Sequence, residues 1–329
     1  MRSSQSVAGA VVILLLLADP ASATDGKPES PWAGTALTYK PGLAAASEVS
    51  SKEQEWSVYA AHVLSLQPRW TPLELLRVAA RLDLDQGMRD FGDLERFDWT
   101  WSDLSLDVGT GDRVTELFSG LRITGGVRVN LPLSEASRRR SMRLSAGPSA
   151  ELSRTFPVLD GLTLAYRGRW TYQFNRWKQA SDGRFLPPPQ VGCGDPHDPG
   201  CQPFVESGAR NTQHVLQHGP SLFLAFSDAL SLSLALGFQT QWLEPYGATT
   251  VTDGTGQPVE VEAGPSASVL RSRWLAGELQ TREADPVSIA LGVCLWDRDV
   301  QLGTKKVVER YADVYLSLSL DIDSAVRGL

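Results

Sequence analysis

A run of thirteen residues, 230–242 (LSLSLALGFQTQW), has bulky apolar side chains at nearly every second position. This period of two is typical of a β-strand, whose successive side chains point to opposite faces. One face carries Leu, Phe and Trp, whereas the other carries Ser, Ala, Gly and Gln. About ten tilted residues let a strand cross the hydrocarbon layer of a bilayer. Because unpaired backbone groups in lipid are costly, such strands must close into a barrel. We therefore predict an all-β fold, a transmembrane antiparallel up-and-down β-barrel.

The amino-terminal residues have the parts of an export signal. Arg2 precedes an apolar stretch at 7–18, and Ala21, Ser22 and Ala23 form a small-residue cleavage site. We expect residues 1–23 to be removed, which leaves a mature barrel domain at 24–329. No other segment reaches the roughly 18 uncharged apolar residues that a transmembrane helix needs. A cleaved signal peptide and a barrel together predict the outer membrane of a Gram-negative bacterium.

The overall composition excludes fewer classes of protein than the periodicity does. The formal net charge of −7 argues against nucleic acid as a partner. A chain with 42% hydrophobic and 21% charged residues could equally be soluble. The same composition is expected of a membrane barrel, because its strands are apolar on one face only.

The segments with strand character are twelve in number, and the connections between them alternate in length. Tight turns at one end and long outer loops at the other are typical of outer-membrane barrels, and this arrangement predicts both termini in the periplasm. The first and tenth segments have the weakest patterns, so a ten-stranded barrel with a loose amino terminus is the alternative. The segments are 34–40, 57–69, 75–86, 99–109, 119–131, 141–155, 162–176, 212–226, 230–243, 266–281, 287–297 and 310–323. Long loops are expected at 41–56, 87–98, 132–140, 177–211, 244–265 and 298–309.

The strand faces opposite the apolar ones predict what lines the lumen. This inward set is rich in charges of both signs, so neighbouring strands could pair opposite charges. One interpretation is a salt-bridge network that fills a narrow barrel. The other is a basic ladder that guides anionic solutes, as in anion and phosphate pores. The candidate lumen-lining residues are Arg77, Arg81, Asp83, Asp103, Asp107, Arg122, Arg128, Arg143, Glu151, Arg167, Arg169, Asp313 and Asp321.

Tryptophans fall near the ends of the predicted strands, where an amphipathic ring can lie at the level of the lipid headgroups. The alternative is the core of a soluble β-sandwich. Strands of eleven or more residues argue against it, since strands in globular sheets average about five or six. The expected girdle residues are Trp70, Trp99, Trp101, Trp170, Trp177, Trp242, Trp274 and Trp296.

Cys193 and Cys201 lie in a loop rich in Pro and Gly, LPPPQVGCGDPHDPGCQP. In an exported protein this arrangement favours a disulfide that closes the loop. The competing hypothesis is a metal site that uses both thiols with His197, Asp195 or Asp198. Cys294 lies in a strand beside small residues, and we expect it to be buried without a chemical role.

Catalytic motifs are few. His214, His218 and Ser221 share one strand, and a His near a Ser suits a nucleophile and its base. However, His218 and Ser221 are three residues apart and therefore on opposite faces, and the H-x-S-N-G signature of outer-membrane phospholipases is absent. No P-loop, zinc-protease helix or G-x-S-x-G motif occurs. We predict no enzyme, metal or cofactor, with a membrane-embedded lipid hydrolase as the residual alternative.

Several segments resemble a group of poorly characterised outer-membrane β-barrel proteins of the myxobacterial type. They are GLRITGGVRVNLPLSEASR, LSAGPSAELSRTFPVLDGLTLAYRGRWTYQFNR, the CGDPHDPGC loop and YLSLSLDIDSAV. The resemblance implies the barrel architecture and names no substrate. Barrels recognised by the assembly machinery commonly end in an aromatic residue, whereas this chain ends in Leu329. We place the assembly signal within the last strand, at 315–322, or expect the six-residue tail to dock at the periplasmic mouth.

The leading functional hypothesis is a narrow channel or transport protein for small hydrophilic solutes, with anionic solutes as one candidate class. The alternative is a plugged structural or surface-display barrel. Outer-membrane lipid and lipopolysaccharide are the expected surroundings. Three consecutive arginines at 138–140 fall in a predicted outer loop and are candidates for contact with lipopolysaccharide phosphates, against the alternative of a solvated loop.

Overall fold

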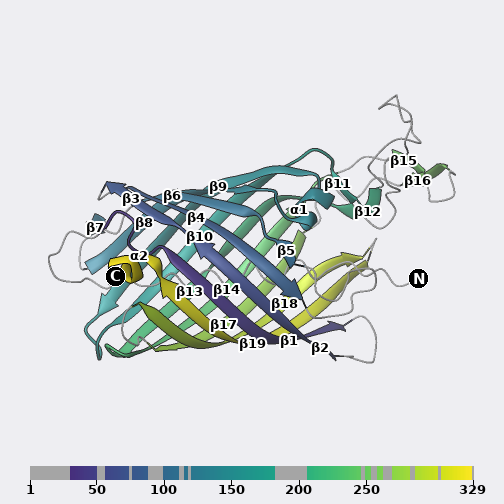
Figure 1. Ribbon diagram of the computed structural model, residues 1–329. Helices are drawn as coiled ribbons and strands as arrows, with labels where there is room; N and C mark the ends of the chain where they lie inside the picture. The colour runs from purple at the N-terminus through teal and green to yellow at the C-terminus, as the bar shows by residue number, and fades with distance from the viewer. Residues whose placement is uncertain are drawn as a thin grey trace.

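The computed structural model describes most of the chain from residue 30 onward, and almost all of the described part is β-structure (Figure 1). The described residues are 30–49, 56–73, 76–87, 99–110, 115–117, 120–181, 206–245, 249–252, 258–261, 269–281, 286–302 and 305–327. Among them, no helix has the length and hydropathy that are needed to span a bilayer. The expected signal peptide at 1–23 and the pair Cys193 and Cys201 lie outside the described residues.

Twelve antiparallel strands close into a barrel, so the predicted fold is confirmed. Each strand pairs with its neighbours in the chain, and the barrel closes where the first strand meets the last, with Ala36 opposite Asp321. The wall is formed by β1 (Ala36–Val49), β2 (Trp56–Gln67) with β3 (Arg69–Leu73), β4 (Leu76–Gly87), β5 (Trp99–Trp101) with β6 (Leu104–Gly109), β8 (Leu121–Leu131), β9 (Met142–Phe156), β10 (Leu162–Asn175), β13 (Thr212–Ser227), β14 (Leu230–Leu243), β17 (Val269–Thr281), β18 (Val287–Leu302) and β19 (Lys305–Asp321). Smaller elements are β7 (Thr115–Leu117), α1 (Glu135–Arg139), β11 (Gln179–Ser181), β12 (Glu206–Arg210), β15 (Thr249–Thr252), β16 (Pro258–Val261) and α2 (Ile322–Arg327).

Two of the wall strands are interrupted where the ladder loses its regular hydrogen bonds. Between β2 and β3 stands Pro68, which has no N–H to donate. Between β5 and β6 stand Ser102 and Asp103. In both places the neighbouring strand β4 continues unbroken and pairs with the pieces on either side. The wall therefore stays closed across the interruptions.

The ten-stranded alternative is wrong, because both weakly patterned segments belong to the wall. β1 pairs with β2 and β19, and β17 pairs with β14 and β18. Two of the loop predictions are also wrong. The segment predicted as a loop at 41–56 continues β1 to Val49, and the one at 298–309 continues β18 to Leu302 and begins β19 at Lys305. Strand residues that project beyond lipid need backbone partners but no apolar face, so their sequence lacks the alternation.

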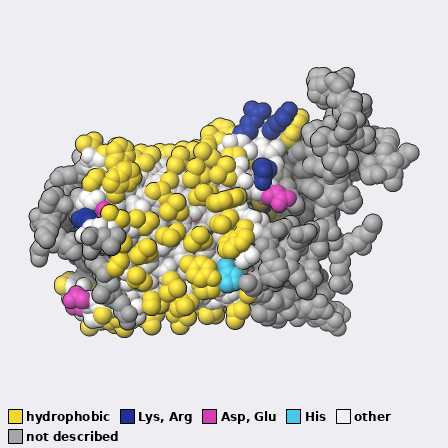
Figure 2. Space-filling model, in the orientation of Figure 1, with side chains coloured by type: hydrophobic (Ala, Val, Ile, Leu, Met, Phe, Trp, Pro, Cys, Tyr) yellow, Lys and Arg dark blue, Asp and Glu magenta, His cyan; other side chains and the backbone are white. Residues whose placement is uncertain are grey.

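The outer surface of the barrel is an apolar belt (Figure 2). Along β18, Leu291, Val293 and Leu295 are 56%, 43% and 48% exposed, whereas the alternating Ala290 and Cys294 are 5% and 7% exposed. Exposed apolar side chains over a whole barrel circumference would make a water-soluble protein aggregate. The surface is therefore that of a barrel embedded in lipid, with the apolar face outward.

The two ends of the barrel differ in the length of their connections. The turn at 157–161 and the turn at 228–229 lie at one end, here named the short-turn end. The segments that carry α1, β11, β12, β15 and β16 lie at the other, here named the loop end (Figure 1). Both described chain ends lie at the short-turn end, where the Thr71 N–H donates to Pro31 O at 2.7 Å and the Ile322 N–H donates to Thr35 O at 2.9 Å.

Replacement of Gly219 by Ala tests the closeness of the wall strands. An added Cβ would lie 2.0 Å from the backbone oxygen of Leu236, so β13 and β14 would have to separate. We expect the free energy of unfolding to fall by about 1–3 kcal/mol. The measurement is urea unfolding in lipid vesicles, followed by the heat-dependent gel mobility of the folded barrel. Gly125→Ala is the control, because its added Cβ would meet its nearest atom at 3.8 Å, and an equal loss there would contradict the packing argument.

Candidate functional site in the barrel lumen

Ion pairs line the inner wall from β4 to β10. Arg128 Nε lies 2.6 Å from Asp107 Oδ1, and these residues are direct partners of β8 and β6. Arg167 pairs with Glu151, its direct partner on β9. Both pairs follow from the alternation and the register, since opposite charges face each other on one side of adjacent strands. They place four of the predicted lumen residues together.

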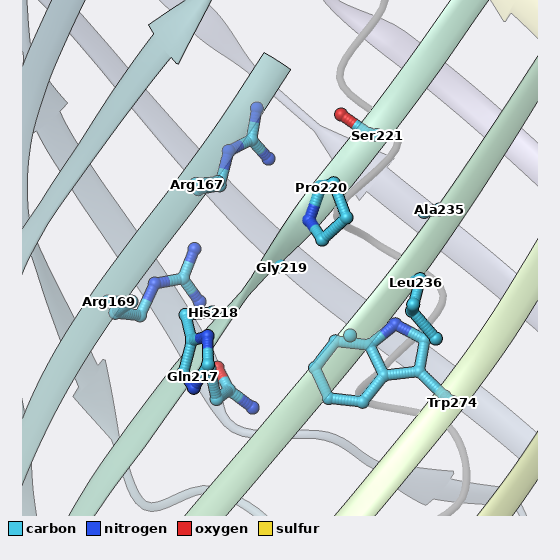
Figure 3. A pocket seen from close by; sticks show the side chains of 11 residues that line it. Arg167, Arg169, Gln217, His218, Gly219, Pro220, Ser221, Ala235, Leu236 and Trp274 are labelled. Carbon is cyan, nitrogen blue, oxygen red and sulfur yellow. The ribbon is translucent and has the colours of Figure 1, made fainter. Parts of the chain in front are cut away.

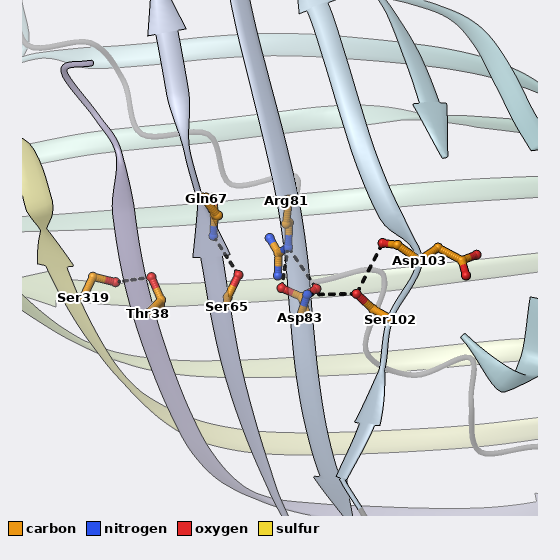
Figure 4. Close-up of polar contacts among 8 residues, drawn as sticks. All are labelled: Thr38, Ser65, Gln67, Arg81, Asp83, Ser102, Asp103 and Ser319. Atoms are coloured by element: carbon orange, nitrogen blue, oxygen red, sulfur yellow. Dashed lines mark hydrogen bonds and ion pairs between the residues drawn. The ribbon is translucent and has the colours of Figure 1, made fainter. Parts of the chain in front are cut away.

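A third ion pair joins residues of a single strand. Arg81 Nε lies 2.8 Å from Asp83 Oδ1, and both are on the inward face of β4. Asp83 is 4% exposed, and its backbone N–H donates to Ser102 Oγ at 2.9 Å (Figure 4). Arg77 lies further along the same face, opposite Gly109. The backbone of Asp83 bridges the interruption of the wall at Ser102, because its O also accepts from the Ser102 N–H at 2.9 Å.

Arg169 differs from its neighbours in having no carboxylate partner among the described residues. Its Nε is buried without a hydrogen-bond partner. Arg128 and Arg167 repel its charge and Asp107 attracts it, so it lies within their electrostatic reach. An unpartnered guanidinium amid paired charges is a candidate site for an anion, because its N–H groups are free to donate.

Arg167 and Arg169 flank a groove on the inner wall, and Trp274 forms its other side (Figure 3). Gly219 and Gly237 also line the groove, and neither has a side chain that could fill it. The Trp274 ring packs flat on Gly237, where an added Cβ would lie 1.9 Å from two ring carbons. The groove has a cavity volume of about 30 Å³, which suffices for one or two water molecules.

Two of the tryptophans expected in the lipid girdle are inside the barrel, so that part of the prediction is wrong. Trp274 and Trp296 are 3% and 6% exposed and are direct partners of β17 and β18. Each shares its strand face with small residues, Ala276 and Cys294 among them. The prediction used the distance of each tryptophan from the strand end. The face on which a residue lies instead follows from its parity, which is its place in the alternation of side chains along the strand. Exposed side chains belong to Trp70, Trp99, Trp101, Trp170 and Trp177.

The inner wall between β17 and β1 carries a second aromatic side chain with polar partners. Tyr315 packs over Gly292 and donates from its hydroxyl to Glu278 Oε2 at 2.7 Å. Lys40 Nζ lies 5.1 Å from the centre of the Tyr315 ring. Asp313 faces inward on the same strand, with Oδ1 buried and without a hydrogen-bond partner. This side of the lumen therefore balances the arginine-rich side with carboxylates.

Neutral hydrogen bonds join other residues around the inner wall. Thr38 of β1 and Ser319 of β19 share one between their hydroxyls at 2.8 Å, and within β2 Gln67 donates to Ser65 at 3.1 Å (Figure 4). On the far strands Gln217 donates to Gln239 at 2.6 Å. These groups keep the interior polar, and their donors and acceptors form hydrogen bonds with other residues of the wall.

Four predicted lumen residues lie near the ends of their strands. Asp103 accepts hydrogen bonds from the Ser134 N–H at 2.9 Å and from the Ser137 hydroxyl, so it holds α1 at the loop end. Asp321 accepts from the backbone N–H groups that begin α2. Arg122 and Arg143 are each the second residue of an antiparallel strand, near opposite ends of the barrel, and their side chains are exposed. Alternation assigned these four to a strand face, and it carries no information on their depth.

Arg210 and Asn211 are buried residues that the sequence did not single out. The Arg210 Nε donates to Glu244 O at 2.7 Å. The Asn211 amide donates to Arg140 O at 2.7 Å and to Trp177 O at 2.8 Å. Both lie within a stretch that is rich in turn-forming residues, and no periodic signal marks them. They tie three connections together at the loop end of β9, β10, β13 and β14.

The histidine and serine of the hydrolase hypothesis are on opposite sides of the wall. Ser221 lies opposite Ala165 and Ala235, with which it shares the inward face. His218 is on the outward face, with Nδ1 2.8 Å from the Tyr166 hydroxyl. Among the described residues, no group of His, Cys, Asp or Glu is arranged to hold a metal ion. Cys294 is a buried free thiol.

Comparisons with known proteins reveal a shared fold. A COG4313 outer membrane channel from Pseudomonas putida F1 has a TM-score of 0.50 and 11% identity, over 90% of this chain and 99% of that chain. The NanC porin has a TM-score of 0.43 and 11% identity, over 84% and 98%. The translocator domain of autotransporter NalP from Neisseria meningitidis has a TM-score of 0.37 and 11% identity, over 86% and 88%. No protein family matches the chain, and no curated protein matches its sequence. The likeness to the first of these structures supports the barrel architecture.

Truncation of Trp274 to Ala tests whether the indole narrows the lumen. The ring forms one side of the groove, so its removal widens the space beside Arg169. We expect a higher single-channel conductance in planar bilayers for the folded variant. Trp170→Ala is the matched control, because that side chain is on the lipid-facing surface and 42% exposed. Equal conductance changes in both variants would contradict the assignment of Trp274 to the solute path.

Proposed function

We propose that the protein is an outer-membrane channel that conducts small hydrophilic solutes and prefers anions. The observation that carries this proposal is Arg169, a buried guanidinium without a carboxylate partner that lines a groove of the lumen. Channels for anions and phosphate use rings or ladders of Arg and Lys in this way. The exported location, the cleaved signal peptide, the assembly machinery as partner and the likeness to the myxobacterial type remain predictions.

The local charge balance supports a preference for anions. On β6 and β8 to β10, Arg128, Arg167 and Arg169 are matched by only two carboxylates, those of Asp107 and Glu151. The pairs with Asp107 and Glu151 neutralise two of the guanidinium groups. One positive charge is left over beside the groove. It would attract a permeating anion and repel a cation.

The width of the barrel sets the size of the solute. A twelve-stranded barrel is intermediate between filled eight-stranded barrels and open sixteen-stranded porins. In the conformation described here the groove beside Arg169 accommodates only water. Entry of a larger anion into this groove therefore requires movement of the long side chains that flank it, Arg167, Arg169 or Trp274. Small hydrophilic anions are the class that such a lumen would admit.

The test is the ion selectivity of Arg169→Gln compared with the wild-type channel. At about 10 Å and an effective dielectric constant of about 20, one charge acts on an ion with about 1.7 kcal/mol. Screening over one Debye length reduces this to about 0.6 kcal/mol, or about threefold in permeability. Loss of the charge lowers the permeability of an anion and raises that of a cation by this factor, so we expect the anion-to-cation permeability ratio to fall about ninefold, measured from reversal potentials across a salt gradient.

Two further variants make this test specific. Glu151→Gln releases Arg167 from its ion pair and should raise the anion preference. Arg154→Gln removes an exposed charge at the short-turn end and should leave the selectivity unchanged. A wild-type barrel that is folded by gel mobility but silent in bilayers would overturn the channel and favour a plugged scaffold. Unchanged selectivity in Arg169→Gln would overturn the role of that residue.

A further inference from the structure

Four cations gather at the loop end beside β9 and β10, and we name them the rim cluster: Arg138, Arg140, Arg176 and Lys178. All four side chains are exposed. Figure 2 shows Lys and Arg side chains gathered at this end, directly beyond the apolar belt. Glu135, in the first turn of α1, is the acid of the same segment. Glu244 lies within electrostatic reach of Lys178, so four cations stand against two acids and the cluster keeps a net positive charge at the edge of the lipid-facing surface.

The two chain segments that carry the rim cluster are held side by side by buried hydrogen bonds. Asn211 is 1% exposed, and its amide donates to both Arg140 O and Trp177 O. The Arg176 N–H donates to Ser141 O at 2.9 Å, and the Trp177 N–H donates to Ser141 Oγ at 3.0 Å. The backbone positions of the cations are thus set before any ligand arrives, which lowers the entropy cost of binding.

The sequence of side chains along β10 indicates the depth of the cluster in the membrane. From the short-turn end, its outward face begins with aliphatic Leu162 and Leu164 and continues to aromatic Trp170 and Phe174. Trp and Tyr belts mark the level of the lipid headgroups. The cations at 176 and 178 come directly after this belt. They therefore stand at the height of the phosphates of the outer leaflet.

We propose that the rim cluster binds the phosphorylated glucosamine headgroup of lipopolysaccharide. Arg guanidinium groups bind phosphate oxygens bidentately, and the cluster supplies three of them with one Lys. The Arg176 guanidinium lies 5.0 Å from the centre of the Trp177 ring, a cation–π contact that orients it. Trp177 is 43% exposed and offers a flat apolar surface beside the charges. The site is separate from the lumen and does not depend on the channel proposal.

The experiment titrates the detergent-solubilised mature barrel with diphosphoryl lipid A and counts bound lipid by native mass spectrometry. The variant is Arg138→Gln with Arg176→Gln. Each cation near an anionic surface contributes about fivefold in affinity, so we expect about 25-fold weaker binding. Fully dephosphorylated lipid A should bind the wild type about as weakly as diphosphoryl lipid A binds the variant.

The matched control removes two exposed cations from the short-turn end, Arg154→Gln with Arg327→Gln. It should bind diphosphoryl lipid A as the wild type does. An equal loss in this control, or equal affinity of the wild type for phosphorylated and dephosphorylated lipid A, would overturn the proposal. The comparison of the two lipids on the wild type stands even if a variant does not fold.

Discussion

Backbone pairing on both sides of every wall strand is the constraint on which the rest of this structure depends. In lipid no water satisfies an unpaired N–H or C=O, so the sheet has to close. Closure brings β1 against β19, 281 residues apart at the bond between Thr38 and Ser319. Where the ladder fails at Pro68, the unbroken β4 spans the interruption. Everything inside the barrel, charged or aromatic, is held in place by this wall.

The interior holds arginines in two arrangements, either paired with a carboxylate or without such a partner. Three inward arginines pair with a carboxylate, Arg81 with Asp83, Arg128 with Asp107 and Arg167 with Glu151. These pairs support the salt-bridge interpretation of the inward charges. Arg169 departs from it, because no described carboxylate pairs with it. The salt-bridge interpretation therefore describes the paired residues, and the proposed function concerns Arg169.

Most of the wall could be predicted because one rule governs it: residues that alternate along a strand face the same side, and residues paired between neighbouring strands also share a side. The pairs Asp107 with Arg128 and Glu151 with Arg167 follow from inward parity alone. The depth of a residue in the membrane and the length of each strand could not be predicted, because alternation does not specify positions along the strand axis. For this reason Asp103 was assigned to the lumen although it holds α1. Trp274 was placed in the lipid girdle for a different reason, because its position near a strand end was used in place of its parity, which directs it inward.

The sequence by itself determined the strand pattern, the closed barrel and the sign of the charges on each strand face, because these depend on local periodicity and on the cost of open edges in lipid. Only the tertiary structure decided which charges pair and which remain, since pairing requires two strands in register. It also decided that Asn211 joins three connections at the loop end. No periodic signal could identify that residue, because its partners lie on backbone segments that only the fold brings together.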